Sequence, residues 1–218
     1  TMVGMRDELS PVVASASIPR HDTEAAGNTL RQAVLRLLTG ESLEAPFSVF
    51  LKVDLGDPVL DREHGCTDPS VLAAVAVCFR RMGARVIVGD SPFADGTPVR
   101  LRWAELGLDQ LAATVGFELA DLEASGAQMA VVKDVVYYVA QPILQADLVV
   151  NLPCLRPHPR FGCAGALTNM LGVLPGFQKT RHAARSGDPA AWGHVLVDLY
   201  SDRKSTRLTP VTNHHLVC

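Results

Sequence analysis

Two short apolar strands joined by one capped helix constrain the fold of this chain more than any other feature. The runs SVFLKV at residues 48–53 and RVIVG at residues 85–89 are β-branched and apolar enough for buried strands. Between them, Asp68-Pro69 is a strong helix start, with aspartate as the cap and proline at the first helical position, and the helical pattern runs to Gly83. Strand, helix and strand within roughly 40 residues form a βαβ unit with parallel strands and a right-handed crossover. The sequence therefore predicts an α/β fold, an open and mostly parallel sheet with helices on both faces, Rossmann-like in arrangement.

The same alternation continues along the chain without a linker or an internal repeat, so we expect one domain over residues 23–200 after an irregular segment over residues 1–22. The further elements that the pattern predicts are a helix over 23–40, a helix over 98–115 interrupted near Gly107, a strand over 117–122, one or two strands within 129–139, and a last helix from Asp188 to Tyr200. The G-x-G-x-x-G spacing and the phosphate loop are both missing from the sequence, so we expect neither a nicotinamide nor an ATP site.

The segment from Ala146 to His182 carries the most unusual residue choices. It begins with an apolar run, residues 148–150, of the kind that fills a strand buried on both faces, and Pro153 ends that strand because proline removes a backbone donor. An apolar helical pattern over residues 167–174 follows. Two basic clusters flank this short helix: Arg156, His158 and Arg160 precede it, and Lys179, Arg181 and His182 come after Pro175-Gly176.

The loop into this helix contains Gly162 and Gly165 beside the first basic cluster. Because the first turn of a helix has unpaired N–H groups and a partial positive charge, such an entry suits a carboxylate or a phosphate. Alternatively, the glycines only allow the turn to close, and Arg156 and His158 are solvated surface side chains. Asn169 favours the first interpretation, because an amide on an otherwise apolar helix needs a specific partner.

Polar residues follow three of the predicted strands at the point where each strand ends. Asp54 and Asp57 follow the first strand, Asp90 and Ser91 the second, and Asn151, Arg156 and His158 the third. Ligands of open parallel sheets bind beyond the carboxyl ends of the strands. We therefore expect Lys52, Asp90, Asn151, Arg156 and His158 around one cleft. Lys52 lies inside an apolar strand, where a charge must find a partner or reach solvent, and we favour a partnered site lysine.

The candidate residues take distinct roles if the protein is an enzyme. His158 would donate or accept a proton, Arg156 would clamp a carboxylate, and Lys52 and Asn169 would position the ligand. The full set comprises His158, Lys52 and His182 as catalytic residues, and Asp90, Ser91, Asn151, Arg156, Gly165, Asn169 and Lys179 as ligand-binding residues. Two assignments stay open. Asp54 and Asp90 are as consistent with capping and turn formation as with a functional role in the site. Cys66 is either a thiol activated by a helix N-terminus or, as we favour, a buried small residue.

Composition narrows the class of protein. A chain of 218 residues with 48% hydrophobic content is long enough for one soluble domain with a real core. A net charge of −3 argues against a nucleic-acid partner. The five cysteines show no CxxC spacing, so we expect reduced thiols in a cytoplasm and neither a disulfide framework nor a zinc site. The longest apolar run, residues 71–79, is too short to span a bilayer, which needs about 20 residues, and we see no signal peptide.

The motifs taken together resemble one known family, the domain of unknown function 362 (DUF362). The similar stretches, in the family's order over residues 48–200, are LKVDLGDP from Leu51, HGCTDPSVLAAV from His64, VIVGDSP from Val86, NLPCLRPH from Asn151, GALTNMLG from Gly165, and Leu174-Pro-Gly with Lys179 and His182. The resemblance implies an α/β fold and an unassigned chemistry, and many members carry or accompany iron–sulfur modules. This chain departs from the family at Thr168, where family members usually have a lysine, and at Arg156, where they often have a lysine.

A weaker similarity links the chain to the N-terminal domain of nickel-pincer lactate racemases. It implies proton transfer by a histidine at His158, nickel binding by a histidine at His182, and a lysine at the place of Thr168 that holds the cofactor. Threonine cannot form that linkage, so we expect no covalently held pincer. Three classes of function therefore stay open: an enzyme acting on a small anionic metabolite, a redox partner of an iron–sulfur protein or domain, and a binding module without chemistry. The second would need its cluster from elsewhere, because the chain has no CxxCxxC run.

The last 18 residues, 201–218, differ from what precedes them. The apolar helical pattern ends near Tyr200, and basic and threonine residues replace it. The run DRKSTRL resembles the conceptual translation of a sequencing-library adapter, so we expect residues 201–218 to be a non-native tail and the sheet to be incomplete at its C-terminal end. Unselected sequence has no reason to bury apolar groups, so we expect this tail to pack poorly.

Overall fold

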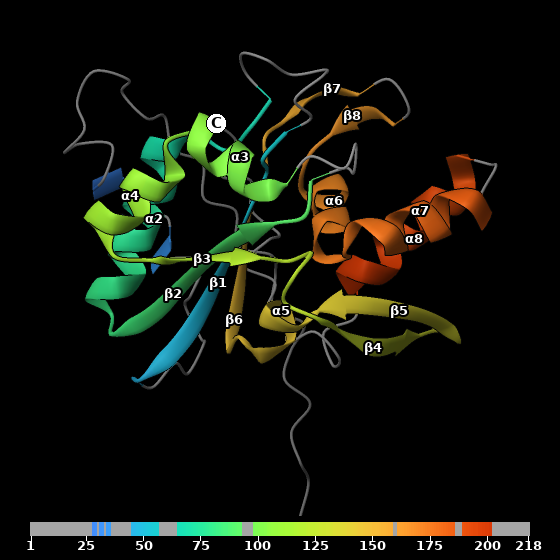
Figure 1. Ribbon diagram of the computed structural model, residues 1–218, viewed down its shortest axis with the longest axis horizontal. Coiled ribbons are helices and arrows are strands. Elements are labelled where there is room, and N and C mark those ends of the chain that lie inside the picture. The colour runs from blue at the N-terminus through green and yellow to red at the C-terminus, as the bar shows by residue number, and fades with distance from the viewer. Residues whose placement is uncertain are drawn as a thin grey trace, which may run out of the picture.

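A parallel sheet of four strands, in the order β3-β2-β1-β6, forms the centre of the computed structural model (Figure 1). The structure describes residues 28–35 with breaks at 30 and 33, and residues 45–56, 65–92, 98–158, 161–185 and 189–201. The four strands are β1 (Phe47–Val53), β2 (Ala84–Asp90), β3 (Glu118–Asp121) and β6 (Leu148–Leu152). The predicted α/β fold is confirmed, and with it the parallel pairing of the first two predicted strands.

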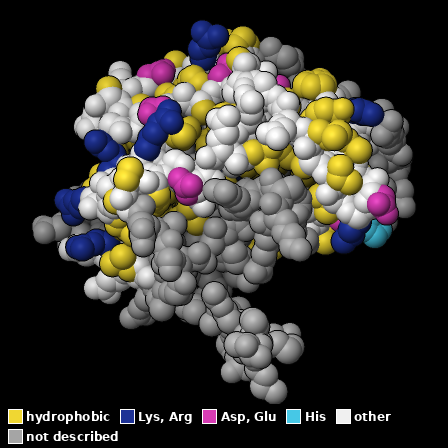
Figure 2. Space-filling view, turned by 90° about the horizontal axis from the view of Figure 1, so that it is seen from below, with side chains coloured by type: hydrophobic (Ala, Val, Ile, Leu, Met, Phe, Trp, Pro, Cys, Tyr) yellow, Lys and Arg dark blue, Asp and Glu magenta, His cyan; other side chains and the backbone are white. Residues whose placement is uncertain are grey.

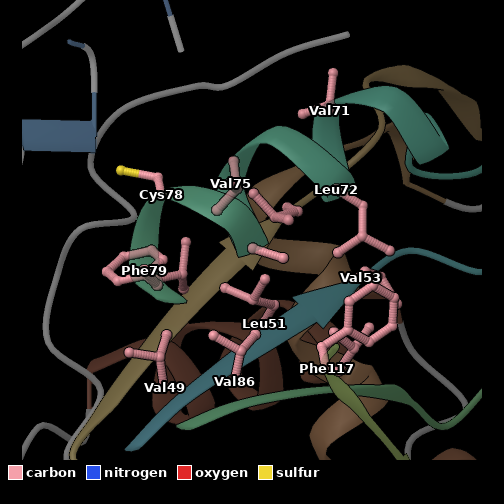
Figure 3. Close-up of a cluster of buried hydrophobic side chains, with 14 of the residues drawn as sticks. Val49, Leu51, Val53, Val71, Leu72, Val75, Cys78, Phe79, Val86 and Phe117 are labelled. Carbon is pink, nitrogen blue, oxygen red and sulfur yellow. The ribbon is translucent and has the colours of Figure 1, made fainter. Parts of the chain in front are cut away.

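Three helices cover one face of the sheet, α2 (Pro69–Arg81), α3 (Val99–Glu105) and α4 (Leu108–Val115) (Figure 1). The side chain of Asp68 caps α2 by accepting a hydrogen bond from Ser70 N at 2.7 Å. The apolar stripe of α2 packs on alternate residues of β1, including Val49 and Leu51 (Figure 3). Full burial of one such side chain contributes about 1.5–3 kcal/mol. Gly107, with a φ of +67°, separates α3 from α4, so the predicted interruption of this helix is confirmed.

The other face of the sheet carries a second apolar core. Phe50 of β1 and Val149 of β6 project into it, because neighbouring residues of a strand point to opposite faces. The elements that cover this face are α6 (Ala166–Asn169), the 3-10 helix η1 (Met170–Val173), α7 (Gly176–Arg185) and α8 (Pro189–Ser201), with α5 (Gln141–Gln145) below them (Figure 1). The predicted last helix, from Asp188 to Tyr200, corresponds to α8.

Strands β4 (Ala127–Val132) and β5 (Val135–Ala140) form an antiparallel hairpin beside the second core. Its turn consists of Lys133 and Asp134, both with positive φ. One side of the hairpin is buried through Tyr137 and Val139, and the other exposes apolar side chains, among them Met129 and Val131. Figure 2 shows hydrophobic side chains gathered at the right of this view, where the hairpin lies. The sequence pattern over residues 129–139 thus gives two strands.

The basic stretch after Pro153 differs from its predicted form. We expected a loop, and the chain instead folds into a hairpin of β7 (Arg156–His158) and β8 (Gly162–Ala164). β8 begins at Gly162, whose φ of +74° is a conformation that favours glycine. The hairpin extends past the carboxyl end of β6 at the upper edge of the molecule in Figure 1. Arg156 and His158 therefore lie on a strand rather than on an irregular segment.

The helical pattern after Gly165 also differs from its predicted form. It is divided between α6 and η1, and the second basic cluster lies within α7 instead of after a helix end. Pro175-Gly176 reads as a stop in the sequence, but the backbone N–H of Gly176 donates to both carboxylate oxygens of Glu123, at 2.8 and 2.7 Å. A carboxylate from a distant segment therefore caps the first turn of α7.

Several expectations lie outside the described residues. They concern Asp57 and Arg160, the irregular segment over 1–22, the ends of the helix predicted over 23–40, and the tail after Ser201. The described residues between 28 and 35 are helical. Across the described part of the chain, no helix has the length and apolar character needed to cross a membrane.

Candidate functional site

A fully buried ion pair lies at the carboxyl ends of β1 and β2. Lys52 Nζ is 2.6 Å from Asp90 Oδ1. The same ammonium group donates to the carbonyl oxygen of Val53 at 2.6 Å and to Asn169 Oδ1 at 2.9 Å. Lys52 is 0% exposed, so this charge depends entirely on protein partners. The predicted partnered lysine has its partner, and that partner is another of the predicted residues.

Two asparagines extend this network from the central strands to α6. Asn169 Nδ2 donates to Asn151 Oδ1 at 2.6 Å and to the carbonyl oxygen of Lys52 at 3.3 Å. Asn151 Nδ2 donates to the carbonyl oxygen of Ala166 at 2.8 Å. The parallel register places Asn151 directly beside Lys52, on the same face of the sheet. Asn169 therefore has the specific partners that an amide on an apolar helix requires.

Gly172 allows η1 to approach the ion pair closely. A Cβ atom built on Gly172 would lie 2.5 Å from Lys52 Cε and 2.6 Å from Lys52 Nζ, and closer still to Asp90 Oδ1. The carbonyl oxygen of Gly172 accepts a hydrogen bond from Ser91 N at 3.2 Å. The other carboxylate oxygen, Asp90 Oδ2, accepts from Leu55 N at 3.0 Å. Asp90 is thus held by a side chain and by the backbone after β1.

A second buried lysine lies next to this group. Lys179 Nζ donates to Ser91 Oγ at 2.7 Å, to the carbonyl oxygen of Pro92 at 3.3 Å and to the carbonyl oxygen of Ser91. Ser91 Oγ in turn donates to Glu123 Oε1. Burial lowers the pKa of Lys179 to about 8, and the nearby Lys52 ammonium acts in the same direction, whereas Asp90 and Glu123 oppose it. The candidates Ser91 and Lys179 therefore contact each other, and the Lys179 ammonium is within electrostatic reach of Asp90.

Glu123 is a functional candidate that the sequence analysis missed. It follows β3 as Asp54 follows β1, so the same rule about the ends of parallel strands would have marked it. It caps α7 and accepts from Ser91 Oγ, so one carboxylate connects three separate parts of the chain.

Asp54 and Arg156 form the outer part of the site. Arg156 Nη2 is 3.6 Å from Asp54 Oδ1, and Arg156 Nε donates to the carbonyl oxygen of Gly65 at 3.3 Å. The Asp54 carboxylate also accepts from Gly56 N at 2.9 Å. Burial and the negative charge of Asp90 raise the pKa of Asp54, against the opposing effects of Arg156 and Lys52. The sequence left Asp54 open between a functional role and a role in capping and turn formation.

Aromatic stacking contacts fix the two candidate histidines. His158 stacks on Phe161 with ring centroids 4.7 Å apart, and His158 Nδ1 accepts from Phe161 N at 3.2 Å. His182 is buried and stacks on Tyr137 at 5.0 Å. The Tyr137 hydroxyl donates to Asp198 Oδ2 at 2.9 Å, and burial together with Asp198 raises the pKa of Tyr137. None of these contacts joins a histidine to the Lys52–Asp90 pair.

The backbone groups of Gly165, at the glycine-rich entry to α6, form hydrogen bonds within the chain. Gly165 N donates to Thr168 Oγ1 at 2.7 Å, and Thr168 Oγ1 donates to the carbonyl oxygen of Gly165 at 3.0 Å. The helix is only four residues long. The expectation that an anion binds at this helix start therefore gains no support from the geometry, and Arg156 is the better candidate for anion binding.

The residues at Thr168 do not fit a lysine-linked pincer cofactor. Thr168 carries a hydroxyl group that is bonded within its own turn, and it has no amine with which to form the linkage. Within the described residues, no three His, Cys, Asp or Glu side chains are grouped so as to hold a metal ion. Burial raises the pKa of the Cys66 thiol, which favours the interpretation of Cys66 as a structural residue over an activated nucleophile.

Comparison with known proteins identifies the same family that the motifs suggested. The model of the family described as "Domain of unknown function (DUF362)" matches residues 49–216. The thylakoid-associated protein sll1697 of Synechocystis sp. is 28% identical over 197 residues, which cover 86% of this chain and 59% of that protein. The chain therefore spans less than two thirds of the length of this relative. No solved structure matches the chain.

Proposed function

The chain belongs to the DUF362 family, and we propose that it is an enzyme or enzyme domain that binds a small anionic metabolite, a carboxylate or a phosphate, at the carboxyl edge of its sheet. One observation carries the proposal. Three cationic side chains, Lys52, Lys179 and Arg156, lie with carboxylates at the ends of neighbouring parallel strands. In open α/β sheets this edge is the usual position of the ligand.

The energetic cost of this arrangement supports a functional role. Desolvating two charges often costs more than their attraction returns, and apolar replacement of a buried ion pair is often neutral or stabilising. Lys52 and Asp90 are buried where η1 packs against the sheet, beside the second apolar core, at a position that apolar side chains could have filled. Shifted pKa values, such as those of Asp54 and Lys179, also concentrate at functional sites.

Within the proposed site the inner network positions the outer groups. Lys52, Asp90 and Asn169 fix the ends of β1 and β2 against α6, and Asp54 follows β1 directly. Arg156 binds the anion, because a guanidinium group matches the two oxygens of a carboxylate or a phosphate. His158 lies two residues further along β7, and residues i and i+2 of a strand project to the same side. It is the proposed proton donor or acceptor.

Isothermal titration of the purified protein with acetate and with inorganic phosphate tests the proposal. We expect saturable binding of at least one of these anions, and a loss of about tenfold or more in affinity for Arg156→Ala, which corresponds to about 1.4 kcal/mol. Arg85→Ala is the matched control, because the Arg85 side chain is 64% exposed on the opposite edge of the sheet. If neither anion binds, or if the two variants bind equally well, the proposal is wrong.

A further inference from the structure

Resting on the proposed anion site, we propose that Asp54 takes up a proton when the anion binds, so that the protonated carboxyl group donates a hydrogen bond to the bound carboxylate or phosphate. The step is a proton transfer: the only covalent bond formed in the protein is the O–H bond of the Asp54 carboxyl group, and the proton comes from the solvent. A solvent proton adds to a carboxylate oxygen of Asp54, and the neutral acid and the anion then share that proton. The inference assigns a ligand role to Asp54 and identifies the ligand as an oxyanion that accepts a hydrogen bond from an acid.

The Asp54–Arg156 pair is more exposed to solvent than the inner Lys52–Asp90 pair. The side chains of Arg156 and Asp54 are 16% and 10% exposed, whereas that of Lys52 is 0% exposed. Their separation of 3.6 Å is wider than the 2.6 Å of the inner Lys52–Asp90 pair. An incoming anion therefore meets Arg156 first, and it meets Asp54 beside it.

Binding to this guanidinium group brings the anion into competition with Asp54. Arg156 already neutralises the Asp54 carboxylate, so an oxyanion that takes the guanidinium must displace that carboxylate or share the cation with it. Either outcome places two negative charges side by side in a largely buried site. Protonation of one carboxyl group removes this repulsion, as it does when two carboxylates share one site.

The surroundings of Asp54 make it the group that accepts the proton. Among the described residues, the charged and titratable groups that act on it are Asp90 from β2, Lys52 from β1, Arg156 from β7 and the Cys66 thiol before α2. Burial and Asp90 already disfavour its ionised form, and Arg156 is the first of the groups that oppose them. When the anion occupies the guanidinium, this compensation weakens.

Local hydrogen bonds hold Asp54 where it must meet the anion. Its carboxylate accepts from Gly56 N, and its backbone N–H donates to Thr67 Oγ1 at 2.7 Å. Thr67 Oγ1 is itself anchored on the carbonyl oxygen of Leu152 at 2.5 Å. The carboxyl group therefore stays beside Arg156, because its own turn and the end of β6 restrain it.

Titration calorimetry with acetate, in buffers of different ionisation enthalpy near neutral pH, measures the number of protons taken up with the anion. We expect an uptake between zero and one in the wild type, and an affinity that rises by up to about tenfold for each unit of falling pH. In Asp54→Asn the uptake disappears and the affinity no longer depends on pH. Glu118→Gln, which removes an exposed carboxylate from β3, keeps the wild-type uptake.

Each alternative result has a defined meaning. Acetate binding without proton uptake, or uptake that persists in Asp54→Asn, contradicts this inference and leaves the proposed anion site intact; uptake lost only in His158→Gln would assign the proton to that histidine. Absence of acetate binding to the wild type overturns this inference, and absence of both acetate and phosphate binding overturns the proposed anion site as well. If Asp54→Asn does not fold, carbon-13 titration of the wild-type Asp54 carboxyl group still decides, since we expect acetate to raise its apparent pKa, and an unchanged value refutes the inference.

Discussion

Replacing Gly172 by alanine tests how closely η1 must approach the buried ion pair. The added Cβ atom would lie 2.5 Å from Lys52 Cε and 2.6 Å from Lys52 Nζ, distances that real Cβ contacts do not show. Lys52 is held by three partners, and Asp90 by Lys52 and the backbone of Leu55. Neither side chain can therefore move without loss of hydrogen bonds, so the strain must displace η1 or separate the pair.

The expected magnitude follows from these two responses. Inserting a methyl group into a close-packed site costs about 1–3 kcal/mol, and separating a buried ion pair costs about 3–5 kcal/mol. We therefore expect Gly172→Ala to lower the free energy of unfolding by about 3 kcal/mol. Gly193→Ala is the matched control, because this glycine is exposed on α8 and a Cβ atom there meets no atom within 4 Å. Alanine is favoured over glycine inside a helix by about 0.5–1 kcal/mol, so the control should gain stability.

Urea denaturation followed by circular dichroism measures both variants under the same conditions. We expect changes of opposite sign for the same chemical substitution, a loss of stability at position 172 and a small gain at position 193. A Gly172→Ala protein as stable as the wild type would show that η1 does not press on the Lys52–Asp90 pair, and the close packing of this part of the site would be refuted.

Three further predictions concern other buried polar groups. Lys52→Met leaves the Asp90 carboxylate buried without its cation and should lower the free energy of unfolding, measured by urea denaturation, by about 3–5 kcal/mol. The double variant Lys52→Met/Asp90→Asn should recover part of this loss. A loss below about 1 kcal/mol in Lys52→Met would refute the prediction. The pKa of Lys179 is about 8 in the folded protein and near 10.5 in the unfolded chain, so the unfolded chain binds more protons between these two pH values. The stability of the wild type relative to Lys179→Met, measured in thermal melts, should therefore rise from about pH 8 to about pH 10.5. A stability difference that does not change with pH would contradict the buried ammonium group. Tyr137→Phe removes the hydrogen bond to Asp198 and should lower the free energy of unfolding by about 1–2 kcal/mol, whereas an unchanged value would show that this bond is not stabilising.

Local signals were sufficient to predict the central sheet and its first crossover. Asp68-Pro69 predicts where α2 begins, and the apolar runs around it predict β1 and β2, because caps and strand patterns are short-range features. The position of Lys52 within an apolar strand is also a local signal, and it predicted a partner for the buried charge. The identity of that partner did not follow from periodicity: the parallel register pairs Lys52 with Gly89, and Asp90 is the next residue along β2.

Long-range contacts decided what the sequence analysis missed. Glu123 caps α7 through Gly176, 53 residues away, so Pro175-Gly176 reads as a helix end although a helix begins there. The hairpin of β7 and β8 contains Pro157 and lacks an alternating apolar pattern, so nothing local marks it as a pair of strands. Arg156 was predicted as an anion ligand, but its pairing with Asp54 depends on how this hairpin packs against the end of β1.

Mapping amide chemical shifts by nuclear magnetic resonance during an acetate titration tests the location of the proposed site most directly. We predict saturable shifts of the amides of Gly56, Gly65 and Arg156, which surround the Asp54–Arg156 pair, and the loss of these shifts in Arg156→Ala. Shifts centred elsewhere, for example on the β4–β5 hairpin, or shifts that persist unchanged in Arg156→Ala, would contradict an anion site at the carboxyl edge of the sheet.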